Sequence, residues 1–396
     1  MTVSAVVLSY RPDNWLDACL KSVSDQVDQL VVVDNGSDRA EASTIATKYN
    51  ATVIGLRSNV GFAAGVNLGV SRSSGDVIAL LNDDAFPHPG WINQSLQVVK
   101  GADVAAVVPK VLRRGLYREV ILEDRHDAPA DHRSLGRMLR SVTAAGVESL
   151  DRLLGAGIHS LEQGDDPLTP KWRWTVPGAP FYVPVATPED EVLINGDPAR
   201  PGPVCRLLNK AGGYMKSDGV LGDIGDGTPD DGRWDTPSEP FFASATAMVM
   251  RREVFDEIGG LAEPFFAYYE DADWCWRARL RGMRVLYEPH AKVEHLHSAT
   301  SGGSALFVNR LATRNRLLTL LRNAPFKIPA ELAINAFRDL GDARARVDLV
   351  EKLPWAIGSR LKSSRSWKVS PDEIWRRWAD ADTTWDAGPA REGISI

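Results

Sequence analysis

Val3-Ser4-Ala5-Val6-Val7-Leu8-Ser9 opens this chain of 396 residues. A near-continuous apolar run rich in β-branched residues is typical of a strand that is buried on both faces of a parallel sheet. Similar runs recur along the chain, with segments of helical spacing between them. We expect strands at 3–9, 30–33, 52–56, 77–81 and 104–108, and helices at 15–23, 41–49, 63–70 and 91–99. This alternation predicts βαβ units, and therefore an α/β fold with a mostly parallel central sheet flanked by helices.

Polar side chains follow the predicted strands where these end. They are Ser9 and Tyr10 after the first strand, Asp34 and Asn35 after the second, Asn59 and Gly61 after the third, and Asn82-Asp83-Asp84 after the fourth. Packing of the core does not require polar groups at these places. Ligands of open α/β sheets bind beyond the carboxyl ends of the strands. The sequence therefore predicts a ligand site at this edge of the sheet.

The three consecutive polar residues Asn82-Asp83-Asp84 suggest a site for a sugar nucleotide and a metal ion. A diphosphate leaving group needs its charge neutralised, and a carboxylate-held divalent cation does this. Asp34 suits a nucleobase imide or a ribose hydroxyl, and an Asx turn is the structural alternative. Asn59 and Gly61 either bring the backbone close to a nucleotide or form a tight turn.

A second acidic stretch, Phe265-Phe266-Ala267-Tyr268-Tyr269-Glu270-Asp271-Ala272-Asp273-Trp274, follows a run of aromatic residues. We expect a loop that opens a helix at about Asp271. The positive end of the helix dipole favours an ionised carboxylate there, and neighbouring aromatic rings would exclude water and raise its basicity. Asp271 therefore suits a general base. The structural alternative is a capped helix with an Asp273–Arg277 ion pair at i,i+4 spacing.

Two histidines flank Leu296 after a predicted pair of short strands at 284–287 and 291–293. If the strand continues, His295 and His297 lie on one face of it. A turn after Val293 would separate them, and we expect only His295 to reach the site, as a ligand of the same cation. A lone surface histidine is the structural alternative.

Composition narrows the class of protein. The net charge of −6 argues against a whole-surface nucleic-acid binder. Three scattered cysteines form neither a disulfide framework nor a zinc motif, which favours a reducing compartment. The first strand does not resemble a signal peptide, and no apolar run reaches membrane-spanning length. We expect a cytoplasmic protein. Peripheral contact with the cytoplasmic face of the membrane and assembly into a homo-oligomer are both compatible with the sequence.

The alternation of predicted strands and helices stops in the middle of the chain, which suggests a division into four segments. Residues 1–112 would form the nucleotide-sugar half of the main domain and residues 241–325 its acceptor and catalytic half. Residues 113–240 would form a long insertion, and residues 326–396 a helical C-terminal extension. Because a functionless loop of this length would be unusual, we expect the insertion to serve the acceptor side. Its motif Lys171-Trp172-Arg173-Trp174 alternates like a strand, and its indoles could stack on sugar rings or pack in a core.

Seven short motifs occur in an order and at approximate spacings that resemble the family 2 glycosyltransferases with a GT-A fold, in particular their rhamnosyltransferase-like branch. The resemblance covers residues 1–110 and 240–325. The motifs are Val6-Val7-Leu8-Ser9-Tyr10, Val32-Val33-Asp34-Asn35-Gly36-Ser37, Asn59-Val60-Gly61-Phe62-Ala63, Leu81-Asn82-Asp83-Asp84-Ala85, Phe266-Ala267-Tyr268-Tyr269-Glu270-Asp271-Ala272-Asp273, Val293-Glu294-His295 and Thr313-Arg314-Asn315-Arg316. Each motif alone is weak, and their order makes the match specific.

The resemblance implies roles for individual residues. Asp34 resembles the nucleobase-binding residue, Asp84 the metal-binding residue and Asp271 the catalytic base. Asp83 lies nearer the ribose, and many members of the branch have another residue at its position. His295 resembles a late ligand of the metal or the diphosphate. Ser9, Tyr10, Asn59, Gly61 and Asn82 complete the expected donor site.

The expected function is an inverting glycosyltransferase that depends on Mg²⁺ or Mn²⁺. Its donor would be a nucleotide-diphosphate sugar, such as a UDP- or dTDP-sugar. Its acceptor would be a saccharide or a lipid-linked saccharide, in the assembly of cell-wall or other cell-surface polysaccharide, glycolipid or a natural-product glycan. Two alternatives stay open, namely a nucleotidyltransferase and a non-catalytic sugar-nucleotide-binding protein. The first normally has a basic, glycine-rich loop near the first strand, which Tyr10-Arg11-Pro12-Asp13 lacks.

Overall fold

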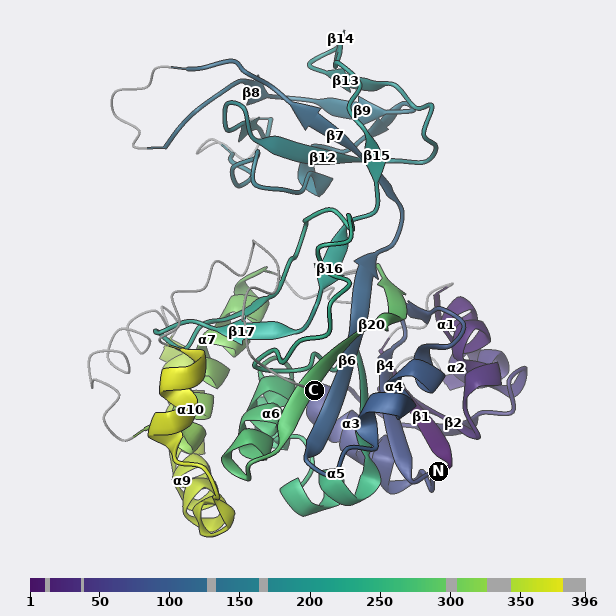
Figure 1. Cartoon of the computed structure of the whole chain (residues 1–396), viewed down its shortest axis with the longest axis vertical. Coiled ribbons are helices and arrows are strands. Elements are labelled where there is room, and N and C mark those ends of the chain that lie inside the picture. Colours follow the sequence, from purple (N-terminus) through teal and green to yellow (C-terminus); the bar gives the residue numbers. More distant parts are fainter. Residues whose placement is uncertain are drawn as a thin grey trace. The chain divides into compact units, whose positions relative to one another are not determined.

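The structure is a computed structural model that describes residues 1–10, 15–36, 39–126, 133–163, 170–296, 305–325 and 343–379. The chain divides into two compact units (Figure 1). The first unit comprises Met1–Val111, Lys210–Gly225 and Gly232–Ile396, and the second comprises Leu112–Asn209 and Asp226–Asp231. The stretch between 113 and 240 therefore contributes to both units, because 210–225 and 232–240 pack with the first.

The first unit is built on one central sheet with the strand order β3-β2-β1-β4-β19-β6-β20-β5. The strands are β1 (Val3–Ser9), β2 (Gln29–Asp34), β3 (Thr52–Gly55), β4 (Val77–Asn82), β5 (Ala85–Pro87), β6 (Val104–Arg113), β19 (Ala247–Arg251) and β20 (Arg284–His295). β1 pairs in parallel with both β2 and β4, and β2 pairs in parallel with β3. β19 is antiparallel to β4 and β6. The predicted α/β fold is confirmed, and the sheet is mixed beyond β4.

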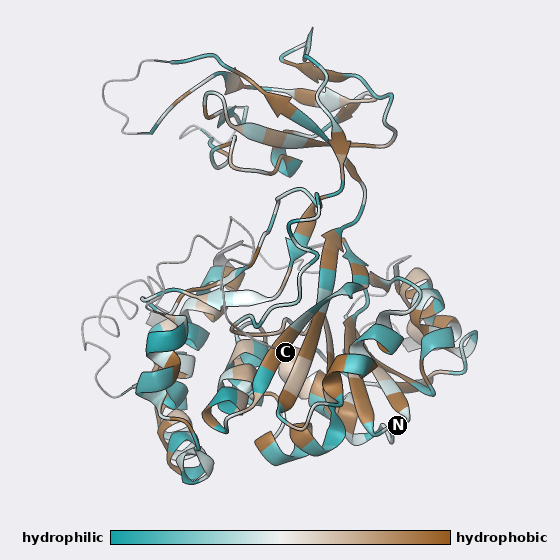
Figure 2. Ribbon diagram, viewed as in Figure 1, coloured by the Kyte–Doolittle hydropathy of each residue, from teal (hydrophilic) through white to brown (hydrophobic). Residues whose placement is uncertain are grey.

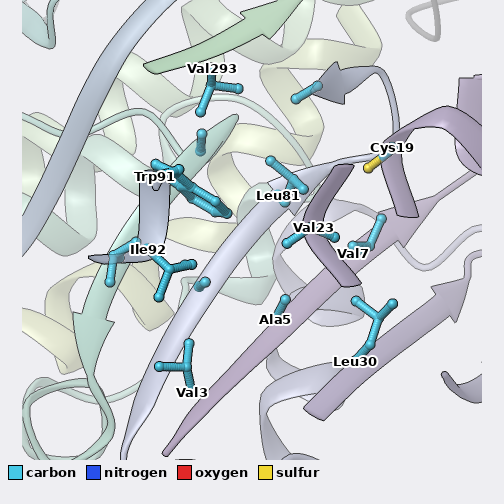
Figure 3. Close-up of a cluster of buried hydrophobic side chains, with 14 of the residues drawn as sticks. Val3, Ala5, Val7, Cys19, Val23, Leu30, Leu81, Trp91, Ile92 and Val293 are labelled. Carbon is cyan, nitrogen blue, oxygen red and sulfur yellow. The ribbon is translucent and has the colours of Figure 1, made fainter. Parts of the chain in front are cut away.

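Helices flank this sheet and bury their apolar faces against it (Figure 1). They are α1 (Trp15–Val23), α2 (Arg39–Thr47), α3 (Phe62–Ser71), α4 (Trp91–Val99), α5 (Arg252–Ile258) and α6 (Glu270–Leu280). In α1 the buried residues recur at helical spacing, as Leu16, Cys19, Leu20 and Val23. Figure 3 shows Cys19 and Val23 in one core with side chains of β1 and with Trp91, and Leu16 and Leu20 belong to the same core.

Two expected elements in the second half of the sheet differ from the structure. The apolar run from Phe242 to Met250 predicts a strand, but the strand begins only at Ala247, because Ala245 and Thr246 form a turn in which the N–H of Ala247 donates to the carbonyl oxygen of Ser244. The two short strands expected at 284–287 and 291–293 are one strand, β20, of 12 residues. Its alternate buried residues pack on the core throughout, so the turn considered after Val293 does not occur.

Further elements of the first unit surround the sheet. A hairpin pairs β17 (Gly213–Met215) with β18 (Leu221–Asp223). The C-terminal helices are α7 (Ala305–Asn323), α9 (Ala343–Ser363) and α10 (Pro371–Trp378). The hydroxyl of Ser370 accepts a hydrogen bond from the backbone N–H of Glu373, which caps α10. Among the described residues, no helix is long and apolar enough to cross a bilayer.

The second unit consists of short strands around its own apolar core. They are β7 (Leu116–Ile121), β8 (Met138–Leu139), β9 (Val142–Ala144), β10 (Val147–Glu148), β11 (Arg173–Trp174), β12 (Pro180–Val185), β13 (Val192–Ile194), β14 (Asp197–Pro198) and β15 (Val204–Cys205), with β16 (Leu208–Lys210) at the boundary. Phe181 and Val183 lie at the centre of this core. The ring of Trp174 stacks on His126. In β12 the consecutive residues Phe181, Tyr182 and Val183 are all buried, and Figure 2 shows hydrophobic residues along the strands of this unit.

Candidate active site

A cavity of about 800 Å³ opens in the first unit at the carboxyl ends of the parallel strands. Its wall includes most of the residues that the sequence singled out, namely Tyr10, Asn59, Gly61, Asn82, Asp83, Asp84, Asp271 and His295. Ser9 and Asp34 are not part of this wall. Both are fully buried behind it. The fold therefore brings the ends of β1, β3 and β4 together with the start of α6 and the end of β20.

Asp83 and Asp84 form a buried acidic pair directly after β4. Their exposed fractions are 5% and 1%. Burial raises the pKa of Asp83 to about 7, with a contribution from Asp84, while a hydrogen bond to Ser9 opposes the rise. Two adjacent carboxylates in a buried place favour either a proton or a cation between them.

The pairing of β20 with β5 explains why His295 reaches this acidic pair. The strands are antiparallel, and His295 is paired with Ala85, the residue after Asp84. The imidazole Nε2 of His295 lies 3.1 Å from Oδ1 of Asp84. The backbone N–H of Leu296 donates to the carbonyl oxygen of Asp84 over 3.1 Å. His297 lies outside the described residues.

Asp84 and His295 suit a divalent cation whose remaining ligands come from the substrate and from water. Among the described residues, no three His, Cys, Asp or Glu side chains gather in a group that could hold a metal ion. In the part of the chain that the structure describes, Asp84 and His295 are the protein groups that would hold the cation. Mg²⁺ is commonly bound by one or two carboxylates together with water and substrate phosphates, so this small ligand set is compatible with a metal-diphosphate complex. It does not suit a closed structural metal site.

Asn35 and Asn59 shape the turn that leads into α3. The side-chain oxygen of Asn35 accepts the backbone N–H of Val60 over 2.9 Å, and its amide nitrogen donates to Oδ1 of Asn59 over 3.0 Å. Oδ1 of Asn59 also accepts the N–H of Gly61. Gly61 has φ of 91°, and a Cβ there would lie 2.5 Å from the carbonyl oxygen of Phe266. The turn therefore requires glycine for both conformation and space.

Asp34 occupies a different place from the one its polar character suggested. It ends β2 with no exposed surface, and the neighbouring Asn35 lines the cavity in its place. Its backbone pairs with Ser9 on one side and Gly55 on the other. A role for Asp34 in binding the nucleobase stays a prediction.

Asp271 lies in the first turn of α6, as its sequence predicted. Its carboxylate accepts the backbone N–H of Ala245 over 3.1 Å and that of Ala272 over 2.7 Å. Burial raises the pKa of Asp271 above its ordinary value, and these two N–H groups and the ammonium of Lys210 oppose the rise. The adjacent Glu270 is buried, and burial raises its pKa well above the usual range. The cavity wall thus contains the carboxyl group of Asp271, which is more basic than an ordinary aspartate.

Asp273 plays the structural part that the sequence offered as an alternative. Its Oδ2 accepts Nε of Arg277 over 2.9 Å and Nη1 of Arg322 over 2.7 Å, and its Oδ1 accepts the amide of Asn323. The carboxylate has no exposed surface. The predicted Asp273–Arg277 pair is therefore present, two residues after Asp271, and it ties α6 to α7.

Lys210 and Asp223 are cavity residues that sequence reasoning missed. They flank the β17–β18 hairpin and form an ion pair of 3.1 Å. Nζ of Lys210 also donates to Ser244 over 3.3 Å. Neither residue belongs to a recognisable motif, and both lie in a glycine-rich stretch without strand-helix rhythm. Only the return of the chain to the first unit after Asn209 reveals them.

Comparison with known proteins identifies the N-terminal part of the chain. Residues 4–139 match the model of glycosyl transferase family 2. This part of the chain is similar to that family. The resemblance predicted from the motifs is confirmed, and the rhamnosyltransferase-like branch stays a prediction.

Two curated relatives and one solved structure extend this result. The chain is 32% identical over 107 residues to an uncharacterized glycosyltransferase, YwdF, of Bacillus subtilis, covering 26% of this chain and 40% of the relative. It is 29% identical over 114 residues to the glycosyltransferase AglE of Haloferax volcanii, covering 26% and 38%. The chain thus spans about two fifths of each relative's length. The crystal structure of GalNAc-T7 with UDP, GalNAc and Mn²⁺ superposes with a TM-score of 0.56 at 11% identity, covering 95% of this chain and 56% of the other, which confirms the GT-A fold.

Proposed function

We propose that the protein is an inverting glycosyltransferase that moves a sugar from a nucleotide-diphosphate donor to an acceptor hydroxyl. One observation carries this proposal. The same cavity contains the buried pair Asp83 and Asp84 with His295, and also the basic carboxylate of Asp271. A diphosphate leaving group and an acceptor proton need these two kinds of group together. The similarity of residues 4–139 to glycosyl transferase family 2 supports the same reaction class.

In the proposed reaction Asp271 takes the proton of the acceptor hydroxyl while the hydroxyl oxygen bonds to the anomeric carbon. The bond from that carbon to the diphosphate breaks on the opposite face, and the nucleoside diphosphate leaves. One displacement inverts the anomeric configuration and requires no covalent intermediate. Mg²⁺ or Mn²⁺, held by Asp84 and His295, would neutralise charge on the diphosphate when bound. Tyr10, Asn59, Gly61 and Asn82 would bind and orient the nucleotide, because they line the same wall.

The experiment that tests this proposal begins with a screen of nucleotide sugars by thermal shift, with Mn²⁺ and with Mg²⁺. UDP-sugars come first, because the solved structure of similar fold holds UDP, and dTDP-sugars follow. A cognate donor raises the melting temperature by mass action. Donors that bind are then incubated with protein and candidate acceptors. Release of nucleoside diphosphate supports the proposal, release of pyrophosphate indicates a nucleotidyltransferase, and binding without turnover indicates a non-catalytic binder.

The exposed face of α9 supports a lipid-linked acceptor as part of the same proposal. Four apolar side chains on this helix are more than half exposed, namely Val347, Val350, Ile357 and Leu361. At 100° per residue they fall within one quarter of the helix circumference. Exposed cations follow at the C-terminal end of α9 and beyond it, at Lys362, Arg365 and Lys368. Apolar residues next to cations favour the surface of an anionic bilayer.

Flotation with vesicles tests this membrane contact. The protein should float with phosphatidylglycerol-containing vesicles, and less with phosphatidylcholine alone or at high salt, because screening weakens the attraction. Replacing Val350 and Ile357 with Asp should abolish flotation without lowering the melting temperature, since both side chains are exposed. A protein that stays unbound, or a double variant that floats like wild type, would leave only a soluble saccharide acceptor. Self-association through this face would instead appear as a dimer in sedimentation experiments without lipid.

A further inference from the structure

The backbone directly before Asp271 is held in an unusual conformation. Phe266, Tyr268 and Tyr269 have φ values of 68°, 70° and 72°. Left-handed conformations are rare for bulky residues other than glycine, and they persist only when the surroundings hold them. Three of them occur within four residues here, immediately before the first turn of α6. The position of the proposed base therefore depends on whatever stabilises this segment.

A single side chain of α7 contacts most of the segment. The amide nitrogen of Asn315 lies 3.0 Å from the carbonyl oxygen of Phe265, 2.8 Å from that of Ala267 and 2.7 Å from that of Tyr268. Its two N–H groups are thus shared among three acceptors. Asn315 has no exposed surface. Loss of this amide would remove hydrogen bonds from the carbonyl groups of Ala267 and Tyr268, whereas the carbonyl of Phe265 also accepts from Arg314 and from the N–H of Ala267.

The neighbouring contacts place the segment between two functional parts of the cavity. Phe266 accepts a hydrogen bond of 2.6 Å from the backbone N–H of Phe62, at the start of α3. Tyr269 accepts one of 2.8 Å from the N–H of Asp273 in α6. Arg314 of the same helix contacts the segment as well. It donates to the carbonyl oxygen of Phe265 over 2.7 Å and forms an ion pair with Asp348 of α9. The carbonyl groups of residues 265–269 are therefore all engaged, and within the part of the chain that the structure describes Asn315 is the side chain that engages three of them.

We propose that Asn315 is a positioning residue, which holds the left-handed segment 265–269 in the conformation that presents Asp271 to the cavity. This inference rests on the proposed function of Asp271. The amide is suited to the task because its short side chain offers two N–H donors to carbonyl groups that follow one another along the backbone. Asn315 itself does not line the cavity, so it acts on the reaction through the backbone.

The test compares Asn315→Asp, which keeps the size and loses the amide donors, with Asn315→Ala. Asn67 provides a matched control, because its side chain also bridges a helix to a loop, donating to Leu261 over 2.9 Å, and it does not line the cavity. Asn67→Ala should lower the melting temperature without changing kcat. In the Asn315 variants we expect kcat to fall on the order of 10- to 100-fold, since small misplacements of catalytic groups have effects of this size. The donor Kd should stay within about threefold, because the Asp83 and Asp84 contacts are untouched.

Hydrogen exchange of the amides of residues 265–271 provides a readout that does not depend on turnover. We expect faster exchange in both Asn315 variants and wild-type exchange in Asn67→Ala. Unchanged exchange in a folded Asn315 variant would overturn the proposed restraint, and faster exchange with wild-type kcat would overturn the positioning role. If the wild-type protein transfers no sugar, the proposed function fails by itself, and exchange still decides whether Asn315 holds the segment.

Discussion

The two parts of the cavity wall that contain Asp83 and Asp271 are built in different ways. The Asp83 part comes from residues 8–84, and the parallel pairing of β1 with β2 and β4 aligns its strand ends. The Asp271 part combines residues from 210–223, 242–246 and 266–271, which α7 holds through side-chain to backbone hydrogen bonds. Backbone register places most of the first group of residues, and the side chains of Asn35 and Asn59 add to it at the turn before α3. The second group depends on single buried side chains, and it should be more sensitive to substitution away from the cavity.

Asp271→Asn should have the largest effect and bears directly on this comparison. The amide keeps the shape and cannot accept the proton, so kcat should fall about 10²- to 10⁴-fold while donor binding stays near wild type. Steady-state kinetics and calorimetry measure the two quantities. Glu270→Gln is the matched control, and its kcat should fall less than that of Asp271→Asn. A larger loss in Glu270→Gln than in Asp271→Asn would assign the base to Glu270.

Asp273→Asn should instead destabilise the fold. Arg277 and Arg322 are both buried against this carboxylate, and removing its charge leaves them without compensation. Breaking a buried ion pair from one side typically costs about 3–5 kcal/mol. Urea unfolding measures the free energy of unfolding of Asp273→Asn and of Asp271→Asn. The value for Asp271→Asn should lie within about 1 kcal/mol of that of the wild-type protein. Equal stability of the two would mean that α6 is not anchored through Asp273.

Asp84→Ala should weaken metal-dependent donor binding on the Asp83 part of the wall. It removes a carboxylate from a site with few other protein ligands, and the loss should be on the order of 10- to 100-fold in Kd. Calorimetry with donor, with and without Mn²⁺, makes the measurement. His295→Ala should show the same dependence on Mn²⁺, because its imidazole adjoins Asp84. Affinity that is unchanged in both variants would move the cation elsewhere.

The pH dependence of kcat should show the smallest effect. Burial raises the pKa of Asp271 above its ordinary value of 3.8. A base must be deprotonated to act, so kcat should fall as the pH decreases through this raised pKa, and should be constant above it. Lys210→Met should shift this acidic fall in kcat to higher pH, because the ammonium group of Lys210 stabilises the ionised carboxylate of Asp271. A fall that stays at the same pH would show that Lys210 is too far from Asp271 to affect it.

Much of the Asp83 part could be predicted from local sequence. Apolar runs mark β1, β2 and β4, and polar residues at their ends identify Asn82, Asp83 and Asp84. The pairing of β20 with β5 could not be predicted, and the expected strand was broken into two pieces because its residues are less uniformly apolar. Asp34 shows a further limit, because a polar residue at a strand end can be buried behind the wall it was expected to line.

The sequence by itself determined the α/β fold, the resemblance of residues 4–139 to glycosyl transferase family 2 and the candidate chemistry of Asp84 and Asp271, because each depends on local periodicity or on a short motif. Only the tertiary structure decided that Lys210 and Asp223 return to the cavity, that Asp273 also binds Arg322 and Asn323 of α7, and that Asn315 contacts the segment before Asp271. These contacts join residues far apart in the chain, such as Asn315 and Ala267, which are 48 residues apart. No local pattern encodes such a pairing, because it exists only once the sheet and its helices have packed.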